Sequence, residues 1–356
     1  MNQITDAMDM VMHLPQPAFC VQDGTIVKVN TAASGRMIEA GTPIAQLLKT
    51  GVDEYQDFSD GCLYLMLNIC DQELGFSVIR KNGFDLFQLE QDTLGYELQA
   101  LALAARELRE PLGGIMITAD QLFPASSNDP TTDAQIARIN QGLFQMLRLI
   151  SNMSDAGHYA TASSIPMEVK NISALLDEIF AKTTALVEYS GIALSFSGIA
   201  EPVYSLVNAD LLERAVLNII SNAIKFTPQG GTIQAKALRR GNKLYLSILD
   251  SGSGIPESSR GNLFSRHTRE PALEDGRYGV GLGLVIVRSA AQRHGGTVLV
   301  DHPADYGTRV TLSLRIQSGS ANLVRSPILR VDYAGERDHG LLELSDVLPS
   351  ELYTNR

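Results

Sequence analysis

The sequence predicts a multidomain α+β protein, and three patterns indicate this class. Residues 13–90 contain short runs in which apolar and polar residues alternate, as they do in half-buried strands. Residues 91–155 repeat apolar residues at steps of three and four, as helices that pack along a seam do. Residues 165–316 mix both patterns with glycine-rich turns. A chain of 356 residues is long enough for two or three compact domains.

The composition is that of a globular protein with an acidic balance of charge. Hydrophobic residues make up 44% of the chain and the formal net charge is -11, which argues against nucleic acid or an anionic membrane as the main partner. The N-terminus, MNQITDAMDMVMHLPQP, lacks the basic start and apolar stretch of a signal peptide, and no apolar run is long enough to span a bilayer. We therefore expect a cytoplasmic protein without membrane insertion.

The three cysteines, Cys20, Cys62 and Cys70, all lie in the first eighty residues, and no pair has metal-ligand spacing. A free cysteine usually behaves as a small hydrophobic residue. We predict that all three are buried thiols; a redox sensor is the alternative.

Residues 1–90 are predicted to form a small α+β domain. The stretch AFCVQDGTIVKVN alternates on either side of Asp23-Gly24, which is a hairpin signature. Three more strand-like runs follow, GCLYLMLNIC, LGFSVIRK and FDLFQLE. Their order resembles a PAS sensor domain, in which VKVNTAAS would turn from strand into helix. No ligand signature is present, so a role in dimer contacts alone is the alternative to sensing.

Residues 91–160 are predicted to form a helical hairpin. The first helix, 91–124, contains Pro111, which should kink it because proline lacks a backbone donor. Neither helix can bury its apolar seam alone, so pairing two hairpins into a four-helix bundle predicts a homodimer. The alternative is a helical core within one chain. The seam positions are Leu94, Leu98, Leu101, Ala105, Leu108, Leu112, Ile115, Ala119 and Leu122, then Ile136, Ile139, Leu143, Met146, Ile150 and Met153.

A candidate nucleotide site begins in LLERAVLNIISNAIKFTP, residues 211–228. Asn218 and Asn222 share one helix face, and Lys225 follows a turn later. Asparagine is a poor helix former, so two on one face need a reason. An amide oxygen is a hard ligand suited to Mg²⁺, and a lysine beside it would neutralise phosphate charge. Alone, the segment could be an ordinary amphipathic helix.

Three further segments strengthen this interpretation. LYLSILDSGSGIP places Asp250 at a strand end, where a carboxylate can accept a hydrogen bond from an exocyclic amine such as that of adenine. GVGLGL precedes the helix LVIVRSAAQRH, whose N-terminal amides favour phosphate. YGTRVTLSLRI places Gly307 and Thr308 before a last strand. The glycines that let the backbone approach a ligand are Gly252, Gly254, Gly279, Gly281 and Gly283.

The four segments in this order resemble the N, G1, G2 and G3 boxes of the GHKL ATPase and kinase superfamily, and NLF at 262–264 lies where histidine kinases have an F box. With the hairpin and the PAS-like domain, residues 13–316 resemble sensor histidine kinases. The resemblance implies a GHKL (Bergerat) α/β sandwich over residues 161–316 that binds ATP and Mg²⁺. It implies that Asn222 ligates Mg²⁺, that Asn218 and Lys225 lie by the phosphates and that Asp250 reads adenine. Residues 265–278 would form a mobile lid. Gly252, Gly254, Gly279, Gly281, Gly283 and Thr308 complete the implied cofactor-binding set.

AARELREPL, residues 104–112, resembles the phosphoacceptor motif of that family, roughly Ser-His-Glu-Leu-Arg-Thr-Pro-Leu. Arg106 stands at the histidine position, Glu107 at the acidic position that helps as a base, and Glu110 where Thr or Asn would orient water. A guanidinium stays protonated and offers no lone pair, so Arg106 cannot act as the nucleophile. Arg106 and Glu110, four apart, can instead form a surface ion pair of about 0.2–0.5 kcal/mol.

No other histidine lies in an acceptor-like context: His158 ends the second helix, His267 lies in the implied lid, and His294 caps a helix, where positive charge suits the dipole. We therefore expect an ATP-binding, histidine-kinase-like signalling protein of a two-component type pathway that does not autophosphorylate at the usual position. Its partner would be a response regulator or another kinase. The alternatives are a kinase acting in trans and a non-catalytic, nucleotide-dependent scaffold.

Residues 317–356 form a C-terminal tail. Its Ser/Gly-rich start is typical of a linker, and LLELSDVLPSELY is apolar enough to dock. The docking place is left open by the sequence.

Overall fold

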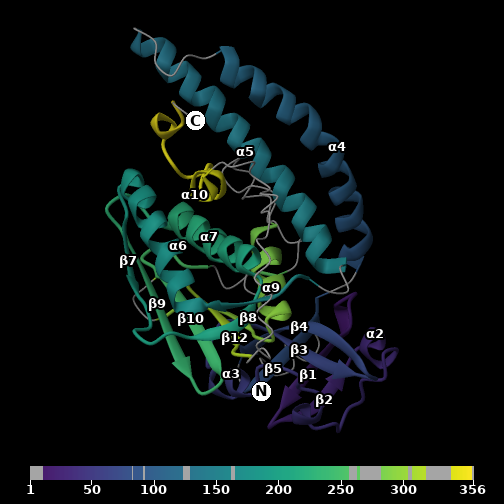
Figure 1. Cartoon of the computed structure of the whole chain (residues 1–356). Helices are drawn as coiled ribbons and strands as arrows, with labels where there is room; N and C mark the ends of the chain where they lie inside the picture. The colour runs from purple at the N-terminus through teal and green to yellow at the C-terminus, as the bar shows by residue number, and fades with distance from the viewer. Residues whose placement is uncertain are drawn as a thin grey trace.

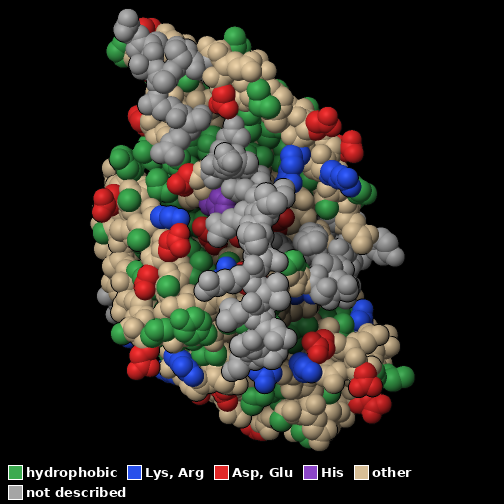
Figure 2. Space-filling view, viewed as in Figure 1, with side chains coloured by type: hydrophobic (Ala, Val, Ile, Leu, Met, Phe, Trp, Pro, Cys, Tyr) green, Lys and Arg blue, Asp and Glu red, His purple; other side chains and the backbone are tan. Residues whose placement is uncertain are grey.

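The structure, a computed structural model, describes residues 11–81, 83–90, 93–122, 129–161, 165–255, 263–264, 282–303, 307–317 and 338–354. Figure 1 shows a layer of strands, helices packed on it, and two long helices that arch over those helices. Among the described helices, none combines the length and apolar character that a membrane crossing requires. On the face drawn in Figure 2, acidic and basic side chains of the described residues are interspersed.

The N-terminal strands form an antiparallel sheet in the order β2-β1-β5-β4-β3. The predicted hairpin is confirmed: β1 pairs with β2, and Asp23 and Gly24 have φ values of 49° and 74°, as a turn with two left-handed residues requires. Asn30 then caps the next helix, since its Oδ1 accepts from the Ala33 N–H at 2.8 Å. The elements are β1 (Ala18–Gln22), β2 (Thr25–Val29), α2 (Thr31–Ser34), η1 (Ile44–Gln46), α3 (Val52–Asp57), β3 (Cys62–Ile69), β4 (Gln72–Lys81) and β5 (Phe84–Leu89).

The C-terminal strands follow the order β11-β12-β10-β9-β7, with helices packed on one face (Figure 1). Residues along β10 alternate between buried and half-buried, as a strand with one covered face does. This is a mixed α/β layer structure. The elements are β6 (Glu168–Asn171), α6 (Ile172–Val187), η2 (Glu188–Ser190), β7 (Ala193–Ser197), β8 (Tyr204–Val207), α7 (Ala209–Phe226), β9 (Thr232–Arg240), β10 (Lys243–Asp250), α9 (Gly283–Arg293), β11 (Val298–Asp301) and β12 (Arg309–Arg315).

The two sheets join edge to edge. β3 pairs antiparallel with β11, with Leu63 opposite Leu299, so the described strands of both regions make one ten-stranded sheet. On α3, Glu54 fastens the junction: its Oε2 accepts from Lys243 Nζ at 2.7 Å and its Oε1 from the Tyr245 hydroxyl at 3.0 Å. Pairing covers two edges that would otherwise expose unsatisfied backbone groups.

Gly61 permits this junction, and replacing it with alanine should destabilise the protein. Its φ is +97°, and a Cβ there would lie 2.8 Å from Asp301 Cα and closer still to Val300 O. Gly24→Ala is the matched control, because Gly24 also has a positive φ, +74°, but open space around it. We expect Gly61→Ala to lower the calorimetric unfolding temperature by several degrees more than Gly24→Ala, since about 1–3 kcal/mol of clash adds to the same backbone strain. Equal decreases would contradict the close approach.

The two long helices are α4 (Thr93–Leu122) and α5 (Pro130–Thr161), which pack against each other. α4 continues through Pro111. The apolar seam divides into two faces. Ala105, Leu112 and Ala119 are buried, as are Ile136, Leu143 and Ile150. The seam positions between them remain exposed: Leu108 by 50%, Ile115 by 55%, Leu122 by 70%, Ile139 by 48% and Met146 by 46%.

The tail docks on the helices. α10 (His339–Glu343) and η5 (Ser350–Tyr353), yellow in Figure 1, lie against α5, α6 and α7. The Asn140 side chain donates to Tyr353 O at 2.9 Å, and the rings of Phe144 and Tyr353 meet edge to face at 5.2 Å. Five hydrophobic residues of the described tail are at most 3% exposed: Leu341, Leu342, Leu344, Leu348 and Tyr353.

The prediction for the cysteines is wrong at one position. Cys20 and Cys62 are buried, and burial raises the pKa of Cys20 to about 11 and the pKa of Cys62 further. Cys70 is exposed, because it lies at the β3–β4 turn, where its φ is +50°.

Candidate functional site

α7 presents the predicted asparagine face. The helix begins after Asn208, whose Oδ1 accepts from the Leu211 N–H at 2.8 Å, and its apolar residues fill the core beneath it. Asn218 is 2% exposed, and Asn222 and Lys225 are partly buried. Within the described part of the chain, the Asn222 amide has no hydrogen-bond partner. The face therefore combines a fixed amide, an uncommitted amide and an ammonium group.

The start of α9 lies against this face. A Cβ on Gly283 would be 2.8 Å from Asn218 Oδ1, so glycine is needed for the approach. The Asn218 Nδ2 donates to Arg214 O at 2.9 Å, which holds the amide. The structure thus brings together the asparagine helix and the last glycine of the GVGLGL run. Gly279 and Gly281 lie outside the described residues, as do Asn262 and residues 265–278.

Asp250 is the last residue of β10, and one of its two carboxylate oxygens is hydrogen-bonded to the backbone. Its Oδ1 accepts from the N–H groups of Gly252 and Thr308, each at 2.9 Å. Burial raises the pKa of the carboxyl group, and the two backbone donors oppose that effect. Oδ2 makes no hydrogen bond to the described residues. One oxygen is therefore held while the other is available to a ligand.

The glycines near Asp250 have a packing role in addition to the predicted one. A Cβ on Gly252 would lie 2.9 Å from Asp250 Oδ1, and one on Gly254 would lie 2.6 Å from His302 Cε1. Gly307 is more crowded, against Asp250 itself. These glycines let two loops close around the carboxylate, a reason that the spacing alone did not indicate.

Four charged residues at this site were missed by the sequence reasoning. Arg148 from α5 and Arg214 from α7 both contact Glu343 of the tail, with Arg214 Nε 3.0 Å from Glu343 Oε1. Asp346 accepts from Arg148 Nη1 at 2.6 Å and from Lys225 Nζ at 3.1 Å. No local motif marks these residues; the acidic positions in LLELSD are the nearest signal.

The acceptor-like segment of α4 is buried at Ala105 and Leu112 and exposed at the positions between them that would carry the chemistry. Arg106, Glu107 and Glu110 are exposed, and no ion pair joins Arg106 to Glu110 within the described residues, so that expectation is wrong. A solvated helix gives an exposed pair too little energy to hold two long side chains. Nearby, Leu101 packs against Leu282 and Val285 and so places this helix beside the start of α9.

His294 is neutral, which corrects the expectation of a positive charge at a helix end. Its Nε2 accepts from the Asn208 N–H at 3.0 Å, and its Nδ1 lies 2.7 Å from Ala290 O. These contacts need a proton on Nδ1 and none on Nε2, and burial lowers the pKa of the ring. His267 and the His158 side chain lie outside the described residues.

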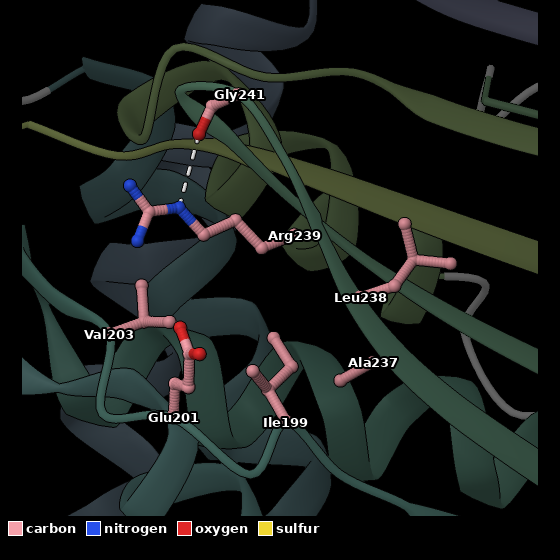
Figure 3. Close-up of a pocket in the computed structure, with 7 residues that line it drawn as sticks. All are labelled: Ile199, Glu201, Val203, Ala237, Leu238, Arg239 and Gly241. Atoms are coloured by element: carbon pink, nitrogen blue, oxygen red, sulfur yellow. Dashed lines mark hydrogen bonds between the residues drawn. The ribbon is translucent and has the colours of Figure 1, made fainter.

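A cavity of about 620 Å³ lies elsewhere (Figure 3). It is near the β9–β10 turn, where Arg239 Nε donates to Gly241 O at 3.1 Å. Asp250 pairs with Ile233 at the opposite end of those strands, so the cavity is separate from the candidate site. Its lining residues are Ile199, Glu201, Val203, Ala237, Leu238, Arg239 and Gly241.

Residues 207–318 match the family HATPase_c, described as histidine kinase-, DNA gyrase B- and HSP90-like ATPases. The match spans the asparagine helix, Asp250 and Thr308. The C-terminal region is therefore similar to this class of ATPase domain.

Two proteins named as kinases are similar to this chain over a longer stretch than the HATPase_c match. The chain is 29% identical over 251 residues to the adaptive-response sensory kinase SasA of Microcystis aeruginosa, covering 65% of this chain and 64% of that one. It is 27% identical over 257 residues to hybrid signal transduction histidine kinase D of Dictyostelium discoideum, covering 69% of this chain and 17% of that one. The chain thus spans less than two thirds of the length of either relative.

A full-length structure of ShkA in complex with AMPPNP shares the fold, with a TM-score of 0.51 at 22% identity over 62% of this chain and 46% of that one. The chain is therefore similar in sequence to histidine kinases, and its residues 207–318 are similar to HATPase_c domains.

Proposed function

We propose that this protein is an ATP-binding, histidine-kinase-like signal transduction protein of a two-component type pathway. The observation that carries the proposal is the close approach of Gly283 to Asn218 on the asparagine helix, within a HATPase_c match that also spans Asp250. A relative named as a sensory kinase and a structural neighbour that holds AMPPNP support it.

The residues present fit Mg-ATP. Asp250 Oδ2 would accept from the adenine amine, while the Asn222 amide oxygen would be the protein ligand of Mg²⁺, which takes few protein oxygens when phosphates supply others. Lys225 would neutralise phosphate charge. The bound metal would supply charge stabilisation at the phosphates.

Calorimetric titration of the full chain with AMPPNP tests this proposal. We expect one nucleotide per chain, with tighter binding in Mg²⁺ than in EDTA. Absence of binding in both conditions would refute the proposal.

Helix α7, which carries the asparagine face, is joined to the long helix α5 by direct hydrogen bonds. Arg214 Nη2 donates to Asn152 Oδ1 at 2.7 Å, and Arg148 Nη2 donates to Ser221 Oγ at 3.1 Å. A change at α7 would therefore alter α5. This favours signalling through ATP-dependent contacts with a response regulator or another kinase. Phosphate transfer by this chain to a separate protein is the second candidate.

The N-terminal region is proposed to be a PAS-like sensor domain. The antiparallel order β2-β1-β5-β4-β3 supports this assignment. Because β3 continues the sheet into β11, a change of β3 would reach the ATPase region directly.

The exposed seam supports a homodimer formed by α4 and α5. Leu108, Ile115 and Leu122 recur every seven residues on a face that the hairpin leaves uncovered. Pairing with a second copy would complete a four-helix bundle.

Ile115→Glu is expected to shift the protein from dimer to monomer at micromolar concentration, because a buried unpaired carboxylate is costly. Light scattering across a dilution series measures the shift. Leu103→Glu is the control, because Leu103 is 66% exposed but lies about 140° round the helix from Leu108. A wild type that is monomeric, or two variants that dissociate equally, would contradict the assigned face.

A further inference from the structure

The tail places two carboxylates on the face of α7 that carries the proposed phosphate and metal ligands. Glu343 is fully buried, with one oxygen 3.0 Å from Arg214 Nε and the other 3.4 Å from Arg148 Nε and 3.5 Å from Asn218 Nδ2. A carboxylate without solvent needs such partners, so the position is a built anion site.

Asp346 occupies the next position along the same face. It bridges Lys225 and Arg148, at 3.1 Å and 2.6 Å. Burial lowers the pKa of Lys225, and the charge of Asp346 opposes that effect, so the ammonium group is stabilised by an anion beside it. Of the three proposed α7 ligands, the tail therefore contacts Asn218 and Lys225, and Asn222 lies between them in the helix.

Buried apolar side chains anchor the tail, among them Leu342 and Leu344, each 0% exposed. Hydrogen bonds add to this anchoring: the Gln141 side chain of α5 donates to Leu348 O at 2.7 Å, and the Tyr353 hydroxyl donates to Leu341 O at 2.8 Å within the tail. Purely structural docking would need the apolar anchors alone. It would not need an acidic side chain on the phosphate-binding lysine.

We infer that residues 338–354 are an intrinsic acidic ligand of the α7 face and that this segment competes with the phosphates of the nucleotide for Lys225. The inference rests on the proposed ATP site. Phosphate and the Asp346 carboxylate are both anions, so they repel each other at one ammonium group, and binding of either weakens the other reciprocally.

Asp346→Asn in the full chain tests the competition. The amide keeps the shape and removes the charge, so Mg·AMPPNP should bind about fivefold more tightly or better than to wild type, as measured by calorimetry. Glu351→Gln is the control, since Glu351 is an exposed acid of the same segment and should leave affinity unchanged. Equal affinity of wild type and Asp346→Asn would overturn the inference while leaving the ATP site intact. Absence of binding in all three proteins would refute the ATP site and the competition with it.

Hydrogen–deuterium exchange on the wild type gives a readout independent of substitution. Saturating Mg·AMPPNP should increase exchange in residues 338–354 by loosening the segment. Unchanged or slower exchange there, with nucleotide bound, would show that the tail and nucleotide occupy the site together and would overturn the inference.

Discussion

Asp250→Asn is expected to lower the affinity for ATP about tenfold or more, with the fold intact. The variant amide can keep its oxygen on the N–H groups of Gly252 and Thr308, which lie 2.9 Å from Oδ1. Its NH₂ group then takes the place of Oδ2. This group and the adenine amine are both hydrogen-bond donors, so no hydrogen bond forms between them. A buried polar group left without its partner costs about 1–3 kcal/mol, which corresponds to this loss.

The base-reading role can be separated from a general loss of the site by comparing ATP with ITP, which carries a carbonyl where adenine has its amine. Calorimetry should show that wild type prefers ATP and that Asp250→Asn loses much of this preference, since an NH₂ group can donate to a carbonyl. Asp23→Asn, in the exposed β1–β2 turn, is the control for removing one negative charge. If both variants bind ATP as wild type does, Asp250 does not read the base.

Features encoded locally could be predicted from the sequence. The Asp23-Gly24 turn, the two long helices and the asparagine face of α7 depend on residues within a few positions of one another. The hydrogen-bonded hold on Asp250 was not predicted, because Thr308 is 58 positions away.

Features that depend on distant partners could not be predicted. The buried Arg148–Glu343 pair joins positions 195 apart, and each residue alone is typical of a solvated helix surface. The pairing of β3 with β11 could not be predicted either, because the sequence of an edge strand does not show which strand it pairs with. A heptad pattern likewise cannot say which seam residues face their own hairpin, so the division between Leu112 and Ile115 required the structure.

α7 is the element where the separate contacts of the molecule meet. Its Arg214 contacts α5 and the tail, its Asn218 contacts the tail and the start of α9, and its Lys225 contacts the tail. If the tail competes with nucleotide as inferred, a nucleotide that displaces Asp346 would also loosen Arg148 on α5. ATP binding would thereby change the long helices even if no phosphate is transferred.

Arg106→His is expected to convert a chain that does not label itself into one that does. Position 106 is exposed on α4, so the substitution should fold, with helix propensity changed by only a few tenths of a kcal/mol. A neutral imidazole would offer a lone pair that a guanidinium lacks. The ring nitrogen would form a bond to the γ-phosphorus while the bond between that phosphorus and the β–γ bridging oxygen breaks and ADP leaves. Glu107, next in the helix, would take the ring proton.

Whether Arg106→His labels itself depends mainly on how the new imidazole is placed relative to the γ-phosphate. Enzymatic phosphoryl transfer needs alignment and charge stabilisation more than covalent chemistry by the protein. Incubation with γ-labelled ATP should give an acid-labile, base-stable label on Arg106→His and none on wild type. Arg138→His, an exposed arginine of α5, is the control for a histidine on a long helix, and Arg106→His with Asp250→Asn should lose the label. Equal labelling of wild type would show that the acceptor lies elsewhere. No label on Arg106→His despite bound ATP would mean that the helix is not aligned with the nucleotide, which favours a nucleotide-dependent scaffold.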